Sequence, residues 1–483
     1  MTGPALKNPL WTAYEAAAAA SGRLYVKQQG AQREARASAD DWAARGVNFD
    51  TRQLAPGDLF IAVQGARDGH EFLTEAQMAG ACAALVSQIP ANAPNGLPLL
   101  QVTDTMAGLK ALAVAARDRN FGKFIAVTGS VGKTSTKDML RAALNPLGDV
   151  HAAVKSFNNE LGVSVSLATL PANADYGVFE IGMNHAGEIT PLTALVRPHA
   201  AIITTIAAAH LENFDSIDGI AAAKAEILTG VRPGGAAILP KDSPYYDFLA
   251  GEAAKAGITR IIAFGETADG KAGARLNSYT QEGDHADIRA EILGEMHEFR
   301  ALMPGKHQAL NALAALAAIK AVGGDLAQAV EGLSAFVPGE GRGATQTVTL
   351  NGKRLRIFDE SYNANPASMK AGIARLAGEP GRRVAVLGAM KELGPDTPAL
   401  HAGLAEPLHA AGVTRLWTAG EEMQALAAAA PSIHAGHEAN AIDLLEPLLA
   451  DLQDGDAILF KGSNASKVGA LLSAFLAKTD GAA

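Results

Sequence analysis

The chain has little cysteine, few aromatic residues and no cluster of basic charge. Its only cysteine, Cys82, lies in an apolar run and is interpreted as a small core residue. One cysteine cannot form an internal disulfide, which fits a reducing compartment. Aromatic residues make up 5% of the 483 positions, and the formal net charge is −9. This charge disfavours binding to a phosphate backbone, so we expect no nucleic-acid partner.

Long apolar runs are also missing. No uninterrupted run approaches the ~20 residues that a membrane-spanning helix needs. The alanine stretch 16–20 follows Glu15 and lacks a basic region in front, so it does not resemble a signal peptide. We expect a soluble, cytoplasmic monomer without membrane insertion.

What the chain does have is ample apolar material. Apolar residues make up 48% and charged residues 19% of the sequence, so most of the length is expected to fold. A chain of 483 residues is too long for one ordinary core. The length predicts about three domains.

Short apolar strands alternate with helical stretches in the first two thirds of the chain. The expected strands span residues 59–63, 83–86, 124–128, 177–181, 201–205 and 236–239. Apolar strands spaced by helices are typical of a parallel sheet covered on both faces. A helix is expected after the glycine-rich turn that follows the strand at 124–128.

A glycine-rich connector at 338–343 separates a third block, with strands expected at 384–388, 415–419 and 457–460. We therefore predict an α/β fold of three domains. Residues 1–119 would form a small α/β domain. Residues 120–338 would form a domain with a parallel sheet, and residues 339–483 a Rossmann-like C-terminal domain. Ligands are expected at the carboxyl ends of the strands and between domains.

The sharpest local signal is a glycine-rich turn between a strand and a helix. It consists of Thr128, Gly129, Ser130, Val131, Gly132, Lys133, Thr134 and Ser135. Glycines let successive N–H groups converge on phosphate oxygens, and the helix N-terminus adds partial positive charge. Lys133 would meet the β- and γ-phosphates, and the Thr134 hydroxyl would bind magnesium. The alternative is a turn that binds nothing, since Val127 stands where a general Walker A loop has glycine.

Three downstream residues are candidate metal ligands or catalytic groups. Glu180 ends an apolar strand, where a carboxylate could bind magnesium or could be a satisfied rim residue. His210 follows another strand, and a capping or core role is equally consistent with its spacing. Lys224 on a helix would by itself be interpreted as a solvated lysine.

With these residues in hand, the chain resembles the Mur ligase family over essentially its whole length. The matching stretches lie at 50–52, 56–62, 68–70, 128–135, 158–162, 180–189, 209–212, 304–311, 359–369 and 386–394. The run Tyr-Asn-Ala-Asn-Pro at 362–366 is the most specific. The Asp-Asn-Pro-Arg run of the diaminopimelate-adding sibling is not found.

The resemblance implies that residues 1–119 bind the UDP-sugar substrate, that residues 120–338 form a P-loop-type ATPase domain and that residues 339–483 form the C-terminal ligase domain. It also implies roles for individual residues. Thr134 and Glu180 match ligands of one magnesium ion, and His210 matches a ligand of a second. Lys224 matches a carbamylated lysine near that metal, a modification that requires an unprotonated amine. The predicted catalytic residues are Lys133, His210 and Lys224.

The remaining matches concern the nucleotide and the substrates. His307, Asn311 and Arg342 match nucleotide-contacting positions, with Asp359 or Glu360 nearby. Thr51, Arg52, Asn158 and Asn159 match stretches associated with a UDP-sugar. Asn363 and Asn365 are expected to face the peptide end of the substrate.

The activity implied is ATP- and Mg²⁺-dependent amide ligation in peptidoglycan synthesis. D-alanyl-D-alanine would be added to UDP-N-acetylmuramoyl-tripeptide through an acyl phosphate. The alternatives are a tripeptide-forming Mur ligase or folylpolyglutamate synthase, a P-loop switch ATPase, and a nucleotide-sugar binding protein without catalysis. The connector at 338–343 is a candidate hinge for the last domain.

Overall fold

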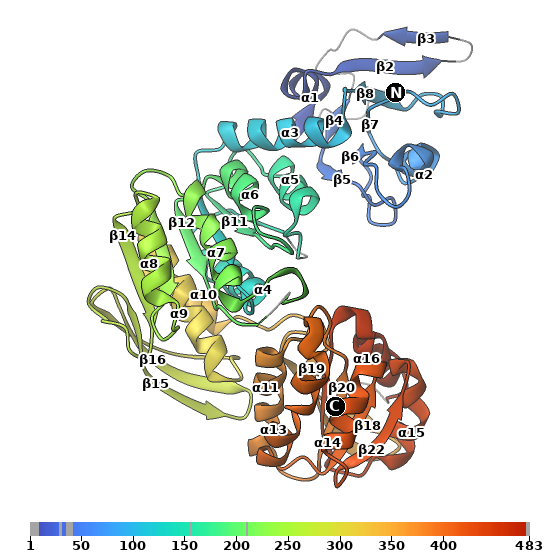
Figure 1. The fold of residues 1–483 in the computed structure, drawn as a ribbon. Helices are drawn as coiled ribbons and strands as arrows, with labels where there is room; N and C mark the ends of the chain where they lie inside the picture. Colours follow the sequence, from blue (N-terminus) through green and yellow to red (C-terminus); the bar gives the residue numbers. More distant parts are fainter. Residues whose placement is uncertain (1–8, 29–30, 35–41, 154–155, 209–210, 480–483) are drawn as a thin grey trace. The chain divides into compact units, whose positions relative to one another are not determined.

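The computed structural model describes residues 9–28, 31–34, 42–153, 156–208 and 211–479. The chain is a mixed α/β protein with three larger sheets (Figure 1). Its internal contacts define two compact units. One comprises Met1–Ala126, Gly148–Ile181 and Thr190–His199, and the other Val127–Leu147, Gly182–Ile189 and Ala200–Ala483. The domain boundaries expected at 119/120 and 338/339 stay predictions.

The N-terminal sheet has the strand order β3-β2-β8-β7-β6-β5. Its strands are β2 (Arg23–Gln28), β3 (Ala31–Glu34), β5 (Gly46–Asn48), β6 (Asp58–Ile61), β7 (Ala83–Val86) and β8 (Pro98–Gln101), and a separate pair joins β1 (Trp11–Thr12) to β4 (Ala43–Ala44). Strands β5 to β8 run parallel, and every residue of β6 and β7 is buried. The two strands predicted in this region are confirmed.

The helices of this region are α1 (Ala13–Ala20), α2 (Leu73–Met78) and α3 (Thr105–Arg119). Helix α1 contains the alanine stretch. A reciprocal pair starts it: the Glu15 N–H donates to Thr12 Oγ1 at 3.2 Å, and the Thr12 N–H donates to Glu15 Oε2 at 3.0 Å. Cys82 precedes β7 and is half-buried, so it is not the core residue that was predicted, and desolvation raises the pKa of its thiol to about 12.

The central sheet has the strand order β10-β11-β9-β12-β13-β14-β15-β16-β17. Its strands are β9 (Lys123–Thr128), β10 (Val150–Ala152), β11 (Tyr176–Glu180), β12 (Ala200–Ile203), β13 (Ala236–Pro240), β14 (Arg260–Gly265), β15 (Ala274–Glu282), β16 (His285–Ile292) and β17 (Glu295–Ala301). The apolar strands β9, β11, β12 and β13 confirm the predictions. The antiparallel extension β15-β16-β17 was not predicted.

Seven helices are described between β9 and the C-terminal sheet. They are α4 (Lys133–Leu144), α5 (Glu160–Ala168), α6 (Ile189–Val196), α7 (Ile217–Ala225), α8 (Tyr246–Lys255), α9 (Lys306–Ala321) and α10 (Leu326–Ser334). Helix α9 is almost wholly buried because it packs against β12 to β16 and against α4 (Figure 1). The first turn of α9 is thereby fixed in place.

The C-terminal sheet has the strand order β18-β19-β23-β20-β21-β22. Its strands are β18 (Ala344–Leu350), β19 (Lys353–Glu360), β20 (Arg383–Gly388), β21 (Arg415–Ala419), β22 (His434–Glu438) and β23 (Ala457–Lys461), and its helices are α11 (Pro366–Ala374), α12 (Thr397–Ala402), α13 (Ala405–Ala410), α14 (Gln424–Ala429), α15 (Leu445–Asp451) and α16 (Val468–Leu476). The three predicted strands are confirmed.

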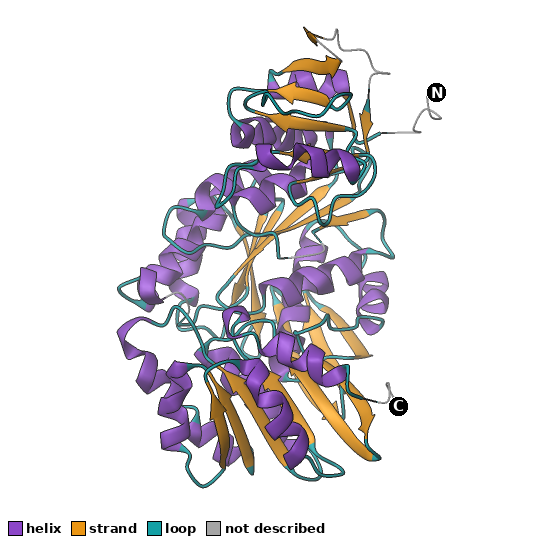
Figure 2. Cartoon of the chain, turned by 90° about the vertical axis from the view of Figure 1, so that its right-hand side faces the viewer, coloured by secondary structure: helices purple, strands orange, loops and turns teal. Residues whose placement is uncertain are grey.

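Successive residues of the C-terminal strands point into two separate cores. On β20, Ala385 and Leu387 belong to one core, whereas Val384 and Val386 belong to the other. Helices lie on both faces of this sheet (Figure 2). The predicted α/β fold class is confirmed. Within the described residues, no helix has both the length and the apolar character needed to cross a membrane.

Candidate functional site

The glycine-rich turn at 128–135 connects the end of β9 to the start of α4. Gly129 has φ +151° and Gly132 has φ +88°, which L side chains rarely adopt. A Cβ at Gly129 would lie 1.9 Å from Thr204 Oγ1, and one at Gly132 would lie 2.9 Å from Asn311 Oδ1. Only glycine therefore fits either position, as a close backbone cradle requires.

The segment after β12 holds this turn from the side. The Thr204 N–H donates to the Thr128 carbonyl at 2.9 Å, and the Ser130 N–H donates to Thr205 O at 2.8 Å. The Thr204 hydroxyl donates to Val131 O at 2.5 Å, and Ser130 Oγ donates to Ala207 O at 2.8 Å. The turn is thus held in one shape by protein contacts alone. His210 lies beyond this segment, outside the described residues.

The first turn of α4 carries the predicted phosphate-binding side chains. Lys133 folds back over the turn and donates from Nζ to Gly129 O at 2.7 Å. Thr134 is buried, and Ser135 is half-buried on the same helix. The N-terminal N–H groups of this helix and its dipole favour an anion in front of Gly132.

Lys224 lies near the end of α7 and is only 1% exposed. This burial contradicts the alternative of a solvated surface lysine. Desolvation lowers the pKa of Lys224 well below its ordinary value, and the positive charge of Lys133 lowers it further. A neutral amine is the form that reacts with carbon dioxide, so the surroundings suit the predicted carbamylation.

Glu180 is the last residue of β11 and is 2% exposed. Asn158 Nδ2 donates to Glu180 Oε1 at 2.8 Å. Asn158 was predicted to face a sugar nucleotide, so its contact with the candidate metal ligand is an additional finding. Asn159 caps α5 by accepting a hydrogen bond from the Gly162 N–H at 2.9 Å.

Two of the predicted ligands, Thr134 and Glu180, fit magnesium by their chemistry. A threonine hydroxyl and a carboxylate are hard oxygen donors, which Mg²⁺ prefers. In the parts of the chain that the structure describes, no three His, Cys, Asp or Glu side chains form a metal-binding group. His210 is not among those residues. The magnesium roles of Thr134, Glu180, His210 and Lys224 therefore stay predictions.

The first turns of α9 carry His307, Gln308 and Asn311, of which Gln308 and Asn311 are buried and His307 is half-buried. Desolvation lowers the pKa of His307, the nearby Glu360 opposes this, and the cations Arg375 and Lys461 lower it further. Gln308 Oε1 is buried and has no hydrogen-bond partner among the described residues. Asn311 faces Gly132, so α9 borders the phosphate turn.

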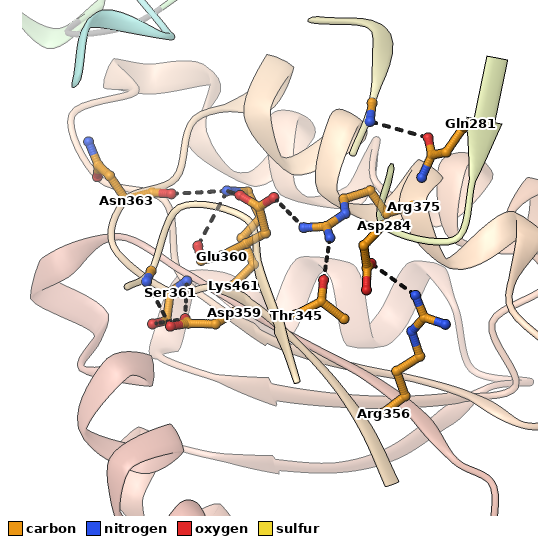
Figure 3. Close-up of polar contacts among 12 residues, drawn as sticks. Gln281, Asp284, Thr345, Arg356, Asp359, Glu360, Ser361, Asn363, Arg375 and Lys461 are labelled. Atoms are coloured by element: carbon orange, nitrogen blue, oxygen red, sulfur yellow. Dashed lines mark hydrogen bonds and ion pairs between the residues drawn. The ribbon is translucent and has the colours of Figure 1, made fainter. Parts of the chain in front are cut away.

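A buried charge cluster holds the loop at 359–365, which contains the predicted nucleotide- and peptide-facing residues (Figure 3). Arg375 Nη1 donates to Glu360 Oε1 at 2.9 Å. Lys461 Nζ lies 3.7 Å from Glu360 Oε2 and donates to Asn363 O at 3.1 Å. The side chains of Arg375 and Lys461 are 3% and 2% exposed, so both cations are desolvated and paired.

The same loop is tied to the connector at 338–343. Asp359 Oδ2 accepts a hydrogen bond from the Gly341 N–H at 2.7 Å. Arg342 lies over the ring of Tyr362, with 3.7 Å between Cζ and the ring centroid. Asn365 caps α11, whereas the side chain of Asn363 is exposed. The Asn365 side chain thus has a structural role in addition to the predicted substrate role.

In the N-terminal domain, Thr51 and Arg52 lie in a tight turn after Asp50. Arg52 donates from Nε and Nη2 to the two Asp50 carboxylate oxygens, each at 2.8 Å. The Arg52 side chain is otherwise 85% exposed. The turn therefore fixes the direction of an exposed guanidinium that is paired with a carboxylate.

Three residues of these contacts were not predicted as site residues from the sequence: Tyr362, Arg375 and Lys461. Tyr362 stood inside the most specific motif, but its partner Arg342 could not be read from spacing. Lys461 ends an apolar strand, as Glu180 does, and that position was the available signal. Nothing in the local sequence marks Arg375.

Comparisons with known proteins agree with this architecture. A family model described as the Mur ligase middle domain matches residues 127–319, and one described as the Mur ligase glutamate ligase domain matches residues 345–464. A curated relative from Escherichia coli strain K12 is 37% identical over 423 residues, covering 87% of this chain and 91% of that enzyme. The chain belongs to the Mur ligase family.

The names of individual relatives indicate a particular ligase within this family. The Escherichia coli protein is named UDP-N-acetylmuramoyl-tripeptide–D-alanyl-D-alanine ligase. A crystal structure of MurF from Acinetobacter baumannii superposes with a TM-score of 0.81 at 29% identity, covering 96% of this chain and 98% of that chain. A MurF from Thermotoga maritima in complex with ADP has the same fold, with a TM-score of 0.74 at 24% identity over 90% of this chain and 97% of that one. The predicted family and ligase class are confirmed.

Proposed function

We propose that this chain joins D-alanyl-D-alanine to UDP-N-acetylmuramoyl-tripeptide, using ATP and Mg²⁺, in peptidoglycan synthesis. The observation that carries the proposal is the 37% identity to the Escherichia coli ligase over 91% of that enzyme. The phosphate turn at 128–135 and the buried Lys224 support it, because both suit phosphoryl transfer. We further propose that the enzyme acts as a monomer in the cytoplasm.

The reaction must activate a carboxylate, because a carboxylate and an amine do not condense in neutral water. The terminal carboxylate oxygen of the tripeptide bonds to the γ-phosphorus of ATP, and ADP leaves. The amine of the dipeptide then bonds to the acyl carbon, phosphate leaves, and a proton departs from the nitrogen. Magnesium, when bound, offsets phosphate charge during the first step.

The side chains of this chain position and stabilise these groups. Lys133 and the N–H groups from Gly129 to Ser135 would bind the β- and γ-phosphates. Thr134, Glu180, His210 and Lys224 would serve as metal ligands. His307, Asn311, Arg342 and Asp359 would contact the nucleotide, and Thr51, Arg52, Asn158, Asn159, Asn363 and Asn365 the substrates.

The test is phosphate release by the purified chain with ATP, Mg²⁺, UDP-muramoyl tripeptide and D-alanyl-D-alanine, omitting each in turn. The proposal expects full turnover only with all components and a pentapeptide product by mass spectrometry. Hydrolysis without either peptide substrate would instead indicate a P-loop switch ATPase. Turnover with folate and glutamate, or with a single amino acid as acceptor, would indicate another ligase of the superfamily.

A further inference from the structure

The stack of Arg342 on Tyr362 is a contact that the proposed reaction does not yet use. The guanidinium carbon lies 3.7 Å from the ring centroid, and Tyr362 remains 40% exposed. A cation over an aromatic face is attracted by the ring quadrupole. The contact therefore limits where the Arg342 side chain can point.

The backbone on both sides builds this stack. Gly341 has φ +72°, and a Cβ there would lie 2.7 Å from the Tyr362 Cβ. The Tyr362 N–H donates to Gly341 O at 3.1 Å, and the Gly343 N–H donates to Asp359 O at 2.9 Å. The connector and the loop at 359–362 are therefore hydrogen-bonded on both sides of Arg342. Only glycine at 341 allows this approach.

The other side of the loop is fixed by the buried charges drawn in Figure 3. Lys461 donates to Asn363 O at 3.1 Å, and Arg375 donates to Glu360 at 2.9 Å. Tyr362 lies between these two anchored residues. Its ring is therefore presented by a rigid loop, which makes it a defined support for Arg342.

The residue after Arg342 lies against α9, the helix that borders the phosphate turn. A Cβ at Gly343 would lie 3.6 Å from Glu360 Oε1 and 3.9 Å from Gln308 Nε2 of α9. One turn further along α9, Asn311 faces Gly132 of the turn itself. The connector thus lies against the first turn of α9, and that helix borders the phosphate turn.

We propose that Tyr362 is a positioning residue that holds Arg342 for the nucleotide, and this inference rests on the proposed function. An arginine offers a planar fork of N–H groups that suits phosphate oxygens, and a stacked guanidinium loses less freedom on binding. Tyr362 belongs to the motif that is expected to face the peptide end of the substrate. The structure assigns it instead to the ATP-dependent step.

The experiment compares Tyr362→Leu and Tyr362→Phe in the full chain, with KM determined separately for ATP and for D-alanyl-D-alanine. Leucine removes the aromatic face, so KM for ATP should rise roughly tenfold while KM for the dipeptide stays within about twofold. Phenylalanine keeps the face and should restore wild-type values. Phe248→Leu, at a 42% exposed aromatic on α8, is the matched control and should change neither constant.

A double-mutant cycle separates a positioning role from a general loss of structure. Arg342→Lys keeps the charge but loses the planar fork, so it should raise KM for ATP by itself. Adding Tyr362→Leu to Arg342→Lys should then raise KM for ATP little further. Fully additive effects, an unchanged KM for ATP in Tyr362→Leu, or a raised KM for the dipeptide alone would each overturn the inference. Tyr362→Met replaces Tyr362→Leu if thermal unfolding shows that the leucine variant is not folded.

The proposed ligase function and the proposed role of Tyr362 can be tested independently of each other. If the wild-type chain does not ligate the two substrates, the function is wrong. The dissociation constant for ATP, measured by calorimetry on the same variants, would still test whether Tyr362 supports nucleotide binding.

Discussion

The carboxylate of Asp50 accepts three hydrogen bonds from Arg52, two from the guanidinium at 2.8 Å and one from the backbone N–H at 3.1 Å. The side-chain bond to Arg52 is the main reason that the pKa of Asp50 is lowered to about 2. The aspartate is therefore ionised throughout the physiological range. It sets the direction of an otherwise exposed arginine.

Asp50→Asn should weaken binding of the UDP-linked substrate. Without the charged acceptor Arg52 is no longer held, so KM for that substrate should rise about tenfold with little change in kcat. Because the pKa of Asp50 is lowered, the pair persists above the unfolded-state value of about 3.9 and is lost only as the pH falls through about 2. Steady-state kinetics from pH 5 to pH 8 should therefore show a similar loss at every pH. Glu71→Gln, which removes an exposed carboxylate near Arg67, is the control and should have no effect.

Lys133→Ala should abolish ADP release while the protein stays folded. Its ammonium lies over the phosphate turn, so its loss should lower kcat by at least about a hundredfold. Coupled ADP detection measures the rate, and circular dichroism checks the fold. Retained turnover would contradict the assignment of the phosphate turn.

Lys224→Met should stabilise the fold and abolish activity. The folded-state pKa of Lys224 is lowered by burial, so the unfolded chain binds this proton more tightly. The loss of stability caused by the buried amine is greatest below the lowered folded-state pKa. It shrinks as the pH rises from there towards the unfolded-state pKa. Urea unfolding in buffer free of carbon dioxide should show a gain of about 2 kcal/mol at pH 6 and a smaller gain at pH 9.

The expected loss of activity in Lys224 variants is tested separately from their stability. Neither Lys224→Met nor Lys224→Ala should recover activity in high bicarbonate, because no amine remains to be carbamylated. A variant with a near-normal rate would show that Lys224 is a buried structural residue and not a catalytic one.

Arg375→Met should destabilise the C-terminal domain. It leaves the carboxylate of Glu360 with one fewer buried partner, and breaking a buried pair costs about 3–5 kcal/mol. Urea unfolding measures the change. Arg289→Met removes an exposed pair with Glu298, whose side chains are 55% and 67% exposed, and should change the free energy of unfolding by less than about 1 kcal/mol. Equal effects in the two variants would contradict the role of burial.

Much of the fold could be predicted because apolar strands buried on both faces leave a continuous signal. The strands β9, β11, β12 and β20 were all located in this way. The phosphate turn was equally accessible, since its residues are consecutive. The extension β15-β16-β17 was missed because it lacks continuous apolar runs: β16 alternates between buried and exposed residues, and β15 and β17 are mostly exposed.

The contacts within the site could not be predicted because they join residues far apart in the chain. Lys461 and Glu360 are separated by 101 positions, and Asn158 and Glu180 by 22. Spacing alone says nothing about such pairs. Asn159 and Asn365 show a related limit, because a family match cannot reveal that each also caps a helix.

The partial burial of Cys82 has a practical consequence. A thiol whose pKa is about 12 holds almost no thiolate at neutral pH, so it reacts slowly with maleimides and iodoacetamides. A cysteine introduced on the surface would then be the preferred site of attachment for a fluorophore. This enzyme can be labelled at a chosen position without first removing its native cysteine.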